Sequence, residues 1–444
     1  MESKKEDKQY ITISPRDFIS GPYIKCPKCG KNAFGVLSVH ATSYSRRCAE
    51  CFFPTYQKGE RWDCYGLPPL NKKVIYLDQF CISNIAKFLN PQIRPESKNE
   101  VSTFWELLFG KLDNLCKLQL IICPDSTSHK DESLLSNFYP SLKRIYQHFS
   151  HNVSFYDFES IRGLQILGCL RKTLGDKETQ DLDVHCITHG VINAWQDRLL
   201  LTVNLKDPDD LIQALKNVRE KSAIGLEGVF KRWQGEKDKR FSYWYEQELG
   251  GYAGTLPELY VKYIKDYMMI SLGLAPFNLN KVLPNEGFSL FSDMEEEFKK
   301  YGIEVPEVNK KITEFLNSRE FRMLPFNKIS SLLYAGVARQ AANGRRKLPT
   351  QGFSKDVEII SGLLPYCDAM FIDNECRNFL NEQPICNEIN YSTKVFSLSN
   401  KDELLEYLES IGNSASKEHL QMIKEVYGED WGKPYWEILK SKSQ

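Results

Sequence analysis

The chain has 444 residues with a formal net charge of zero, and 42% of its residues are hydrophobic. This length and composition predict a folded protein of about two to four domains with an ordinary packed core. No apolar run approaches the roughly 20 residues of a membrane span, and the charged start MESKKEDKQY lacks the apolar stretch of a signal peptide. We therefore expect a cytoplasmic protein without membrane contact.

The charge is unevenly distributed along the chain. Residues 1–73 hold thirteen Lys or Arg against seven Asp or Glu, so the remainder is acidic. A basic front end is compatible with contact to a polyanion such as nucleic acid.

Four of the thirteen cysteines form two close pairs, CPKC and CAEC, at Cys26, Cys29, Cys48 and Cys51. Eighteen residues separate the pairs, a spacing typical of a zinc site in which four thiolates surround the ion. The spacer FGVLSVHATSYSRR predicts short strands with a turn. We therefore expect residues 1–69 to form a zinc ribbon, whose zinc is structural because protein ligands fill all four positions.

The first strand after the ribbon is predicted at 74–77, and it ends at Asp78, where a helix follows. A carboxylate just past a buried strand lies at the carboxyl edge of a sheet, where open α/β folds place their ligands. As a single residue, Asp78 is equally compatible with capping the helix.

A second strand is predicted at 118–123, where Pro124 ends it. Ser126 or Thr127 is then suited to cap a helix that carries His129 and Glu132. Glu132 is thereby expected at the same edge as Asp78. His129 either assists proton transfer there or donates a hydrogen bond that orients a carboxylate.

The middle of the chain is predicted to be helical. Apolar residues at helical spacing mark 207–222, 256–274 and 328–342. The run 231–247 interleaves basic and aromatic residues and suits stacked bases, although an amphipathic helix with core aromatics is favoured. The basic segment 343–347 either contacts phosphate or caps a helix.

The stretch FSKDVEIISGLLPYCDAMFIDN, residues 353–374, carries three aspartates. Asp356 opens a predicted helix, while Asp368 and Asp373 stand at the two ends of a short strand. Because five strand residues span about 16 Å, Asp368 is favoured as a structural or turn residue. A strand at 395–397 and a helix from Lys401 are predicted to follow.

Together, YLDQ, ICPDSTSHKDES and LPYCDAMFIDN resemble the PIN-like family of metal-dependent ribonucleases. The resemblance implies a parallel sheet flanked by helices, with acidic side chains gathered around Mg²⁺ or Mn²⁺. It implies a discontinuous nuclease domain at 70–160 and 350–444, split by a helical insertion at 161–349. The residues that match the catalytic and metal-binding positions are Asp78, Glu132, Asp356 and Asp373, with His129 and Asp368 as auxiliary candidates.

The function that follows is hydrolysis of phosphodiester bonds, of RNA rather than DNA, in RNA processing, toxin action or defence. Such a nuclease must be restrained in its own cell, which leaves room for a regulatory protein partner. The alternative is a non-catalytic nucleic-acid-binding adaptor with a degenerate PIN-like fold. The sequence carries no glycine loop of the P-loop or dinucleotide type, which argues against nucleotide hydrolysis and NAD chemistry.

Overall fold

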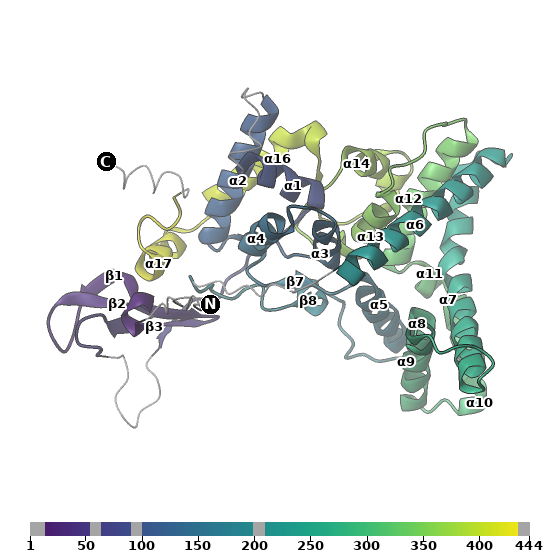
Figure 1. Ribbon diagram of the computed structural model, residues 1–444, viewed down its shortest axis with the longest axis horizontal. Coiled ribbons are helices and arrows are strands. Elements are labelled where there is room, and N and C mark those ends of the chain that lie inside the picture. The colour runs from purple at the N-terminus through teal and green to yellow at the C-terminus, as the bar shows by residue number, and fades with distance from the viewer. Residues whose placement is uncertain (1–13, 54–63, 90–99, 199–208, 434–444) are drawn as a thin grey trace, which may run out of the picture.

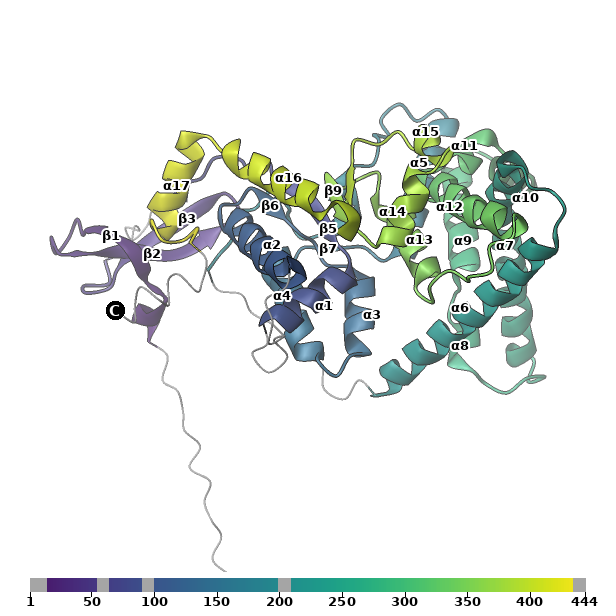
Figure 2. The same ribbon diagram turned by 90° about the horizontal axis from the view of Figure 1, so that it is seen from above.

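The computed structural model describes residues 14–53, 64–89, 100–198 and 209–433. Three regions lie in a row: a small antiparallel sheet, a parallel sheet with helices on both faces, and a group of long helices (Figure 1, Figure 2). The predicted α/β class, with an N-terminal antiparallel sheet and a parallel sheet, is confirmed. Among the described residues, no helix combines the length and apolar character that crossing a membrane requires.

The antiparallel sheet has the strand order β1-β2-β3-β4. Its strands are β1 (Ser20–Lys25), β2 (Asn32–His40), β3 (Ser43–Cys48) and β4 (Tyr65–Gly66). Helix α17 (Lys417–Tyr427), from the far end of the chain, packs on this sheet. The buried Arg46 fastens the two, since its guanidinium donates to the carbonyl oxygens of Phe34 and of Glu425 in α17.

The parallel sheet has the strand order β10-β9-β5-β6. Its strands are β5 (Lys73–Leu77), β6 (Ile121–Ile122), β9 (Ala369–Phe371) and β10 (Lys394–Phe396). Leu77 is paired with Phe371, and Phe371 with Phe396, so three strands end at the same level. Their carboxyl ends therefore form one common edge.

Side chains of β5 alternate between two hydrophobic cores, as expected for a strand covered on both faces. Val74 and Tyr76 point into one core and Ile75 and Leu77 into the other. The face of Ile75 is covered by α1 (Gln79–Leu89), α2 (Glu100–Lys117), α4 (Tyr139–Ser150) and α16 (Lys401–Asn413). The face of Tyr76 is covered by α5 (Phe158–Thr173), α12 (Pro325–Ala342), α13 (Phe353–Leu363) and α14 (Asn374–Asn381).

The long helices share a core with the parallel sheet. Phe230 and Trp233 of α6 (Asp209–Gly235) and Trp244 of α7 (Phe241–Ser271) are buried in the same cluster as Tyr76. The expected boundary at residue 160 falls inside α5, and α17, which was expected in the domain of the parallel sheet, packs on β1 and β2 of the antiparallel sheet. The remaining elements are α3 (Thr127–Leu134), β7 (Ser154–Phe155), β8 (Thr188–His189), α8 (Leu279–Val282), α9 (Glu286–Lys300), α10 (Val305–Leu316), α11 (Arg319–Arg322), α15 (Ile385–Glu388) and three short 3-10 helices, Pro15–Phe18, Val184–Ile187 and Leu398–Asn400.

The second predicted strand was too long. Helix α2 runs to Lys117, and its end is closed by hydrogen bonds from the Leu118 and Gln119 amides to carbonyl oxygens of the last helical turn. Gln119 adopts a positive φ of 59°, which a strand residue cannot do. Only Ile121 and Ile122 remain to pair with β5.

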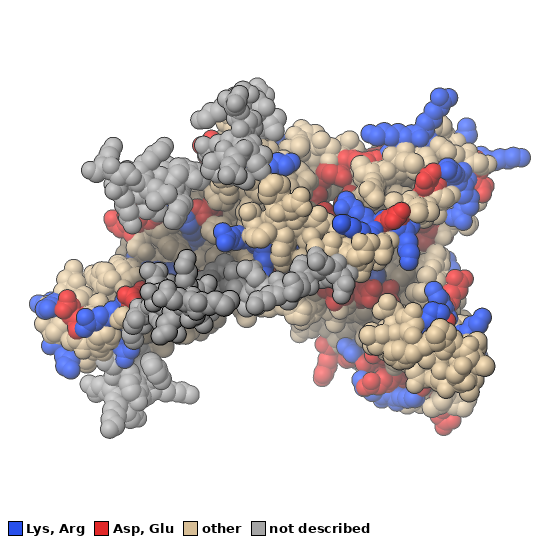
Figure 3. Space-filling model, in the orientation of Figure 1, with Lys and Arg blue, Asp and Glu red and all other residues tan. Residues whose placement is uncertain are grey.

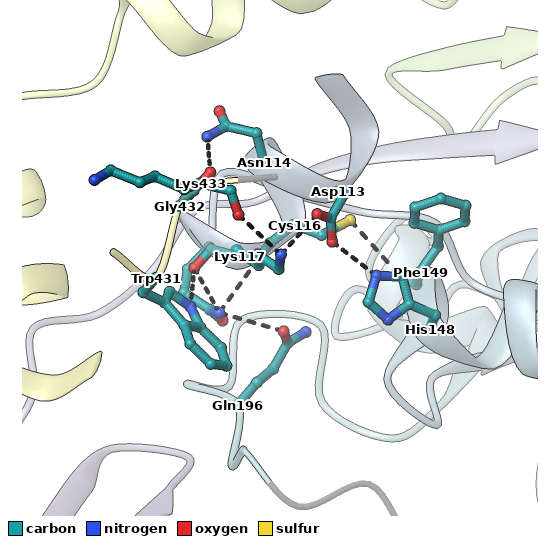
Figure 4. Close-up of polar contacts among 11 residues, drawn as sticks. Asp113, Asn114, Cys116, Lys117, His148, Phe149, Gln196, Trp431, Gly432 and Lys433 are labelled. Carbon is teal, nitrogen blue, oxygen red and sulfur yellow. Dashed lines mark hydrogen bonds and ion pairs between the residues drawn. The ribbon is translucent and has the colours of Figure 1, made fainter. Parts of the chain in front are cut away.

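The end of α2 is also a junction between distant parts of the chain (Figure 4). Trp431 donates from its indole nitrogen to the carbonyl oxygen of Lys117 over 2.9 Å. Asp113, 1% exposed, accepts from Lys117 Nζ over 2.7 Å and pairs with His148 Nε2 over 2.8 Å. The C-terminal segment and α4 are thereby fixed to one turn of helix.

We expect Asp113→Ala to lower the free energy of unfolding by about 1–3 kcal/mol, because the partly exposed donors Lys117 and His148 lose their shared, buried acceptor. Burial alone would raise the pKa of Asp113, but hydrogen bonds from His148 and Lys117 outweigh it and lower the pKa. A lowered pKa means that this stabilisation is present above the usual carboxyl pKa and is lost as the pH falls through the folded value. Urea denaturation from neutral to acidic pH measures both effects.

Asp181→Ala is the control for this measurement, because Asp181 pairs with Lys172 while its side chain is 97% exposed. It should leave the denaturation midpoint unchanged. Equal midpoints for the two variants would contradict the role assigned to Asp113.

Candidate functional site

The four paired cysteines form a compact group near the N-terminus. Their sulfur atoms all lie within 4.8 Å of one another. The Cys26–Cys51 and Cys29–Cys48 sulfur distances are both 3.7 Å. Thiolates bound to a tetrahedral zinc at about 2.3 Å stand about 3.8 Å apart, so this group fits a structural metal such as zinc.

Each cysteine pair is held by a turn that contains a residue in the left-handed conformation. Gly30, with φ of 73°, donates to the carbonyl oxygen of Cys26 over 3.0 Å, and Phe52, with φ of 55°, donates to that of Cys48 over 3.0 Å. Burial works to raise the pKa of the Cys26 thiol, but nearby backbone amides outweigh it and lower the pKa to about 7. The Lys31 amide works to lower the pKa of the neighbouring Cys29 thiol, but burial and the other thiols raise it to about 11. The first turn thus favours the thiolate, which is the form that binds metal, at Cys26.

A second cluster lies at the carboxyl edge of the parallel sheet. Asp78 directly follows β5, and its amide donates to the carbonyl oxygen of Phe371 over 3.0 Å. Asp373 lies two residues beyond β9, where its Oδ1 caps α14 by accepting from the Cys376 amide over 2.6 Å. Helix capping therefore accounts for one oxygen of Asp373 and leaves the other available.

The other two carboxylates come from helices. Glu132 is carried by α3, whose N-cap is Ser126, and Asp356 lies in the first turn of α13. The structure thus brings all four sequence-predicted acidic residues to one edge, from segments up to about 300 positions apart in the chain.

The electrostatics of the cluster follow from burial and like charges. Burial, with the charges of Asp78, Asp373 and Glu132, raises the pKa of Asp356 to about 9. Burial, with the charges of Glu132 and Asp373, raises the pKa of Asp78 to about 7. The pKa of Glu132 is also raised, mainly by burial, although Arg219 and Lys355 counteract the shift. Without a cation, the folded protein therefore holds protons in this cluster at neutral pH.

The tightest part of the cluster includes a residue that the sequence reasoning missed. One oxygen each of Asp356 and Asp373 and the sulfur of Cys376 lie within 4.8 Å of one another. Asp78 and Glu132 are outside this closest group and act on it through their charges. Cys376 stands three residues after the cap Asp373, so the helix start at Asp373 was the signal that placed the thiol beside the carboxylates.

His129 is fully hydrogen-bonded to backbone. Its Nε2 lies 2.6 Å from the carbonyl oxygen of Leu77, and its Nδ1 accepts from the Ser126 amide over 3.1 Å. Burial lowers its pKa to about 4, so the ring is neutral. Neither expected role, proton transfer or a bond to a carboxylate, matches these contacts. His129 instead ties the residue before Asp78 to the helix that carries Glu132.

Asp368 lies at the opposite end of β9 from the acidic cluster. It pairs with Lys73 over 2.8 Å and accepts from the Val74 amide over 2.8 Å. These contacts align the starts of β5 and β9. The structural interpretation that the sequence favoured agrees with this position.

We expect Asp356→Asn to stabilise the metal-free protein at about pH 8 by on the order of 1–4 kcal/mol. Because the folded pKa of Asp356 is raised to about 9, the native state keeps a proton that the unfolded chain releases above its usual pKa. Wild-type stability should therefore fall as the pH rises from about 4 to about 9, and the variant should flatten this slope. Thermal unfolding in EDTA across this pH range measures the effect. If stability depends on pH equally in Asp356→Asn and wild type, Asp356 does not have the raised pKa.

The aromatic residues of the segment 231–247 belong to the core. Trp233 and Trp244 are buried, as the favoured interpretation of that segment predicted. Its basic residues remain on the surface, and Figure 3 shows Lys and Arg side chains along the upper right edge, over the turn between α6 and α7 and the end of α12. Gln234 donates to the carbonyl oxygen of Arg345 over 2.8 Å, which joins this turn to the basic segment 343–347.

Comparisons of the chain with protein-family models, with curated proteins and with solved structures found no significant match.

Proposed function

We propose that the protein is a metal-dependent nuclease that hydrolyses phosphodiester bonds, with RNA as the preferred substrate. The observation that carries this proposal is the convergence of Asp78, Glu132, Asp356 and Asp373, from four separate segments, at one edge of the parallel sheet. Burial and the gathering of like charges raise the pKa values of Asp78, Glu132 and Asp356 and oppose folding. A ligand of positive charge that compensates them is therefore the natural reason for the arrangement.

The donor atoms fit a hard divalent cation. Carboxylate oxygens suit Mg²⁺ or Mn²⁺, which are commonly held by one or two carboxylates together with water and substrate phosphate. Asp356 and Asp373 are the pair that would hold the ion, because their oxygens are within 4.8 Å of each other. The buried Cys376 thiol has a pKa raised well above its usual value, so it contributes as a neutral neighbour.

A cation bound there would lower the pKa of a coordinated water and stabilise charge on the phosphate. In the hydrolysis, a bond from water oxygen to phosphorus forms, the bond to one ribose oxygen breaks, and that oxygen takes a proton. Asp78 and Glu132, which lie further out, are suited to orient the attacking water and accept its proton. These roles are assigned by position, because Asp356 and Asp373 belong to the closest group of ligand atoms and Asp78 and Glu132 lie outside it.

A cationic surface next to the cluster supports a polyanionic substrate. Lys237 and Lys239 in the turn between α6 and α7, and Arg346 and Lys347 in the loop before α13, are exposed. None of these four has an ion pair among the described residues. The loop is anchored by an ion pair from Arg345 to Glu375, two residues after Asp373. The surface therefore leads toward the carboxylates, as a track for a phosphate backbone would.

The order of elements supports the PIN-like resemblance. An aspartate after the first strand, a glutamate on the helix after the second strand, an aspartate in a first helical turn and an aspartate after a later strand follow one another here. All four positions carry acidic residues, which favours a nuclease over the alternative of a non-catalytic nucleic-acid-binding adaptor.

The test is cleavage of single-stranded RNA and of DNA with the matching sequence by the full chain, with Mg²⁺, with Mn²⁺ and with EDTA. We expect cleavage of RNA that requires the metal and stops in EDTA. Preferential cleavage of DNA would show that DNA, and not RNA, is the substrate. If the protein binds both polymers without metal and cleaves neither, the nuclease proposal is wrong and the protein is a non-catalytic nucleic-acid-binding adaptor.

A further inference from the structure

A cavity of about 490 Å³ adjoins the acidic cluster. Its wall includes Glu132, so the cavity and the cluster share a carboxylate. Helices α3, α5, α6, α12 and α13 enclose it, and α6 passes close to α3 on its way to the helical end of the molecule (Figure 2). The volume falls within the roughly 300–1,000 Å³ of small-molecule pockets.

The interior of the cavity is aromatic and apolar. Phe158, Tyr252, Phe326 and Tyr334 contribute rings, and α6 adds Val218, whose side chain is 65% exposed in the absence of an occupant. Flat, apolar surroundings of this kind favour a planar ring system as ligand.

Besides Asp131, Glu132 and the ion pair of Lys355 with Glu358, two arginines line the cavity. Arg162 is neutralised by Glu286 over 2.9 Å and Glu358 over 3.3 Å, and its guanidinium lies 5.8 Å from the ring centre of Tyr252. It therefore offers a fixed planar surface and little free charge. Arg219 is exposed, lines the cavity near Glu132, and has no ion pair among the described residues. One available cation beside the carboxylates suits an anionic group at that end.

We propose that this cavity binds a nucleotide of the substrate strand, with its base between the aromatic side chains and its phosphate between Arg219 and the acidic cluster. The proposal rests on the proposed nuclease function and adds to it a means of base selection. A nucleotide is the occupant that matches the cavity at both ends: a planar ring in the aromatic interior and a phosphate beside Arg219 at the carboxylate edge.

The first test measures binding of the four ribonucleoside 5′-monophosphates to the full chain in Mg²⁺ by calorimetry. Ser222 is exposed on α6 and lines the cavity, so Ser222→Trp fills the cavity without disturbing the core. Asn217 is exposed on the same helix outside the cavity, and Asn217→Trp is the matched control. We expect at least one monophosphate to bind wild type and Asn217→Trp at least about tenfold more tightly than Ser222→Trp.

Equal affinity in the two tryptophan variants, or no binding of any monophosphate, would overturn the proposal. Monophosphates have no phosphodiester bond, so this result does not depend on catalysis. The second test maps cleavage sites in RNA of random sequence, where we expect a base preference in wild type that Ser222→Trp loses. Cleavage without any preference, together with no nucleotide binding, would reject the base pocket while leaving the nuclease intact.

Discussion

Replacing Asp373 with Asn is expected to reduce metal-dependent cleavage of RNA by at least about 1,000-fold. Loss of a residue that merely supports a metal ligand typically costs about 10- to 100-fold, and loss of a ligand itself should cost more. The Oδ1 of Asp373 caps α14, and an oxygen of Asp373 lies within 4.8 Å of an oxygen of Asp356. Asparagine retains the cap, because its side-chain oxygen also accepts a hydrogen bond, while it loses the negative charge.

The same strand supplies the control. Asp368 stands at the other end of β9, where it pairs with Lys73 on the surface side of the sheet. Asp368→Asn removes an equal charge at the same strand, yet cleavage should stay within about threefold of wild type, because partly exposed pairs of this kind contribute little. Rates from initial cleavage of a labelled RNA, with circular dichroism to confirm folding, give the comparison.

If Asp373→Asn and Asp368→Asn lose equal cleavage activity, then cleavage depends on the total charge near β9 and not on the position of Asp373. Full activity in Asp373→Asn would reject the acidic cluster as the reaction centre. If Asp373→Asn is folded, binds RNA and does not cleave it, then RNA binding by the cationic surface is independent of cleavage by the acidic cluster.

Removing one ligand of the four-cysteine group is expected to unfold the N-terminal sheet and to abolish zinc binding. A structural zinc contributes about 10–16 kcal/mol of apparent binding free energy in small zinc domains. The opposite part of the sheet packs on α17 through Val36, Val39 and Tyr44, so the effect should be largest at the cysteine end. Around the cysteines, the buried core consists of little beyond Phe34. For Cys48→Ala we therefore expect the metal content to fall from about one zinc per chain to none.

Cys64→Ala is the matched control, since Cys64 is exposed and lies outside the four-cysteine group. It should retain zinc and resist limited proteolysis as wild type does. In Cys48→Ala, cleavage by protease should concentrate in the N-terminal sheet, because the parallel sheet has its own two cores. Full zinc content in Cys48→Ala would contradict the assignment of the ligands.

Local pattern was sufficient to predict the strands that flank the acidic residues. Val74 to Leu77 and Ala369 to Ile372 are short apolar runs bounded by charged residues, and the structure has β5 and β9 there within one residue. Capping chemistry was equally informative, since Ser126 begins α3 as expected. The two cysteine pairs predicted that their four thiols lie together, because this spacing is typical of a metal site.

Long-range packing was not predictable from the sequence. The run 118–123 is apolar and was assigned to one strand, whereas the end of α2 takes its first residues. The spacing after Asp373 places Cys376 beside that carboxylate. Nothing in the sequence, however, indicates that Arg219 of α6 faces Glu132, because this pair meets only through tertiary contacts. The helical segment likewise was treated as an insertion because its shared core with the sheet depends on Trp233 and Trp244 folding back.

The pairing of β5 with β9 also determines when the molecule is complete during its synthesis. The partner of Leu77 is Phe371, so the edge of β5 that faces β9 has no neighbour until nearly 300 further residues have been added. At about 5–20 residues per second, synthesis of the residues between Leu77 and Phe371 takes roughly 15–60 s, and during this time β5 lacks its partner β9. Every prematurely ended product that lacks β9 also lacks Asp373, so under the proposed function such a chain would not cleave RNA.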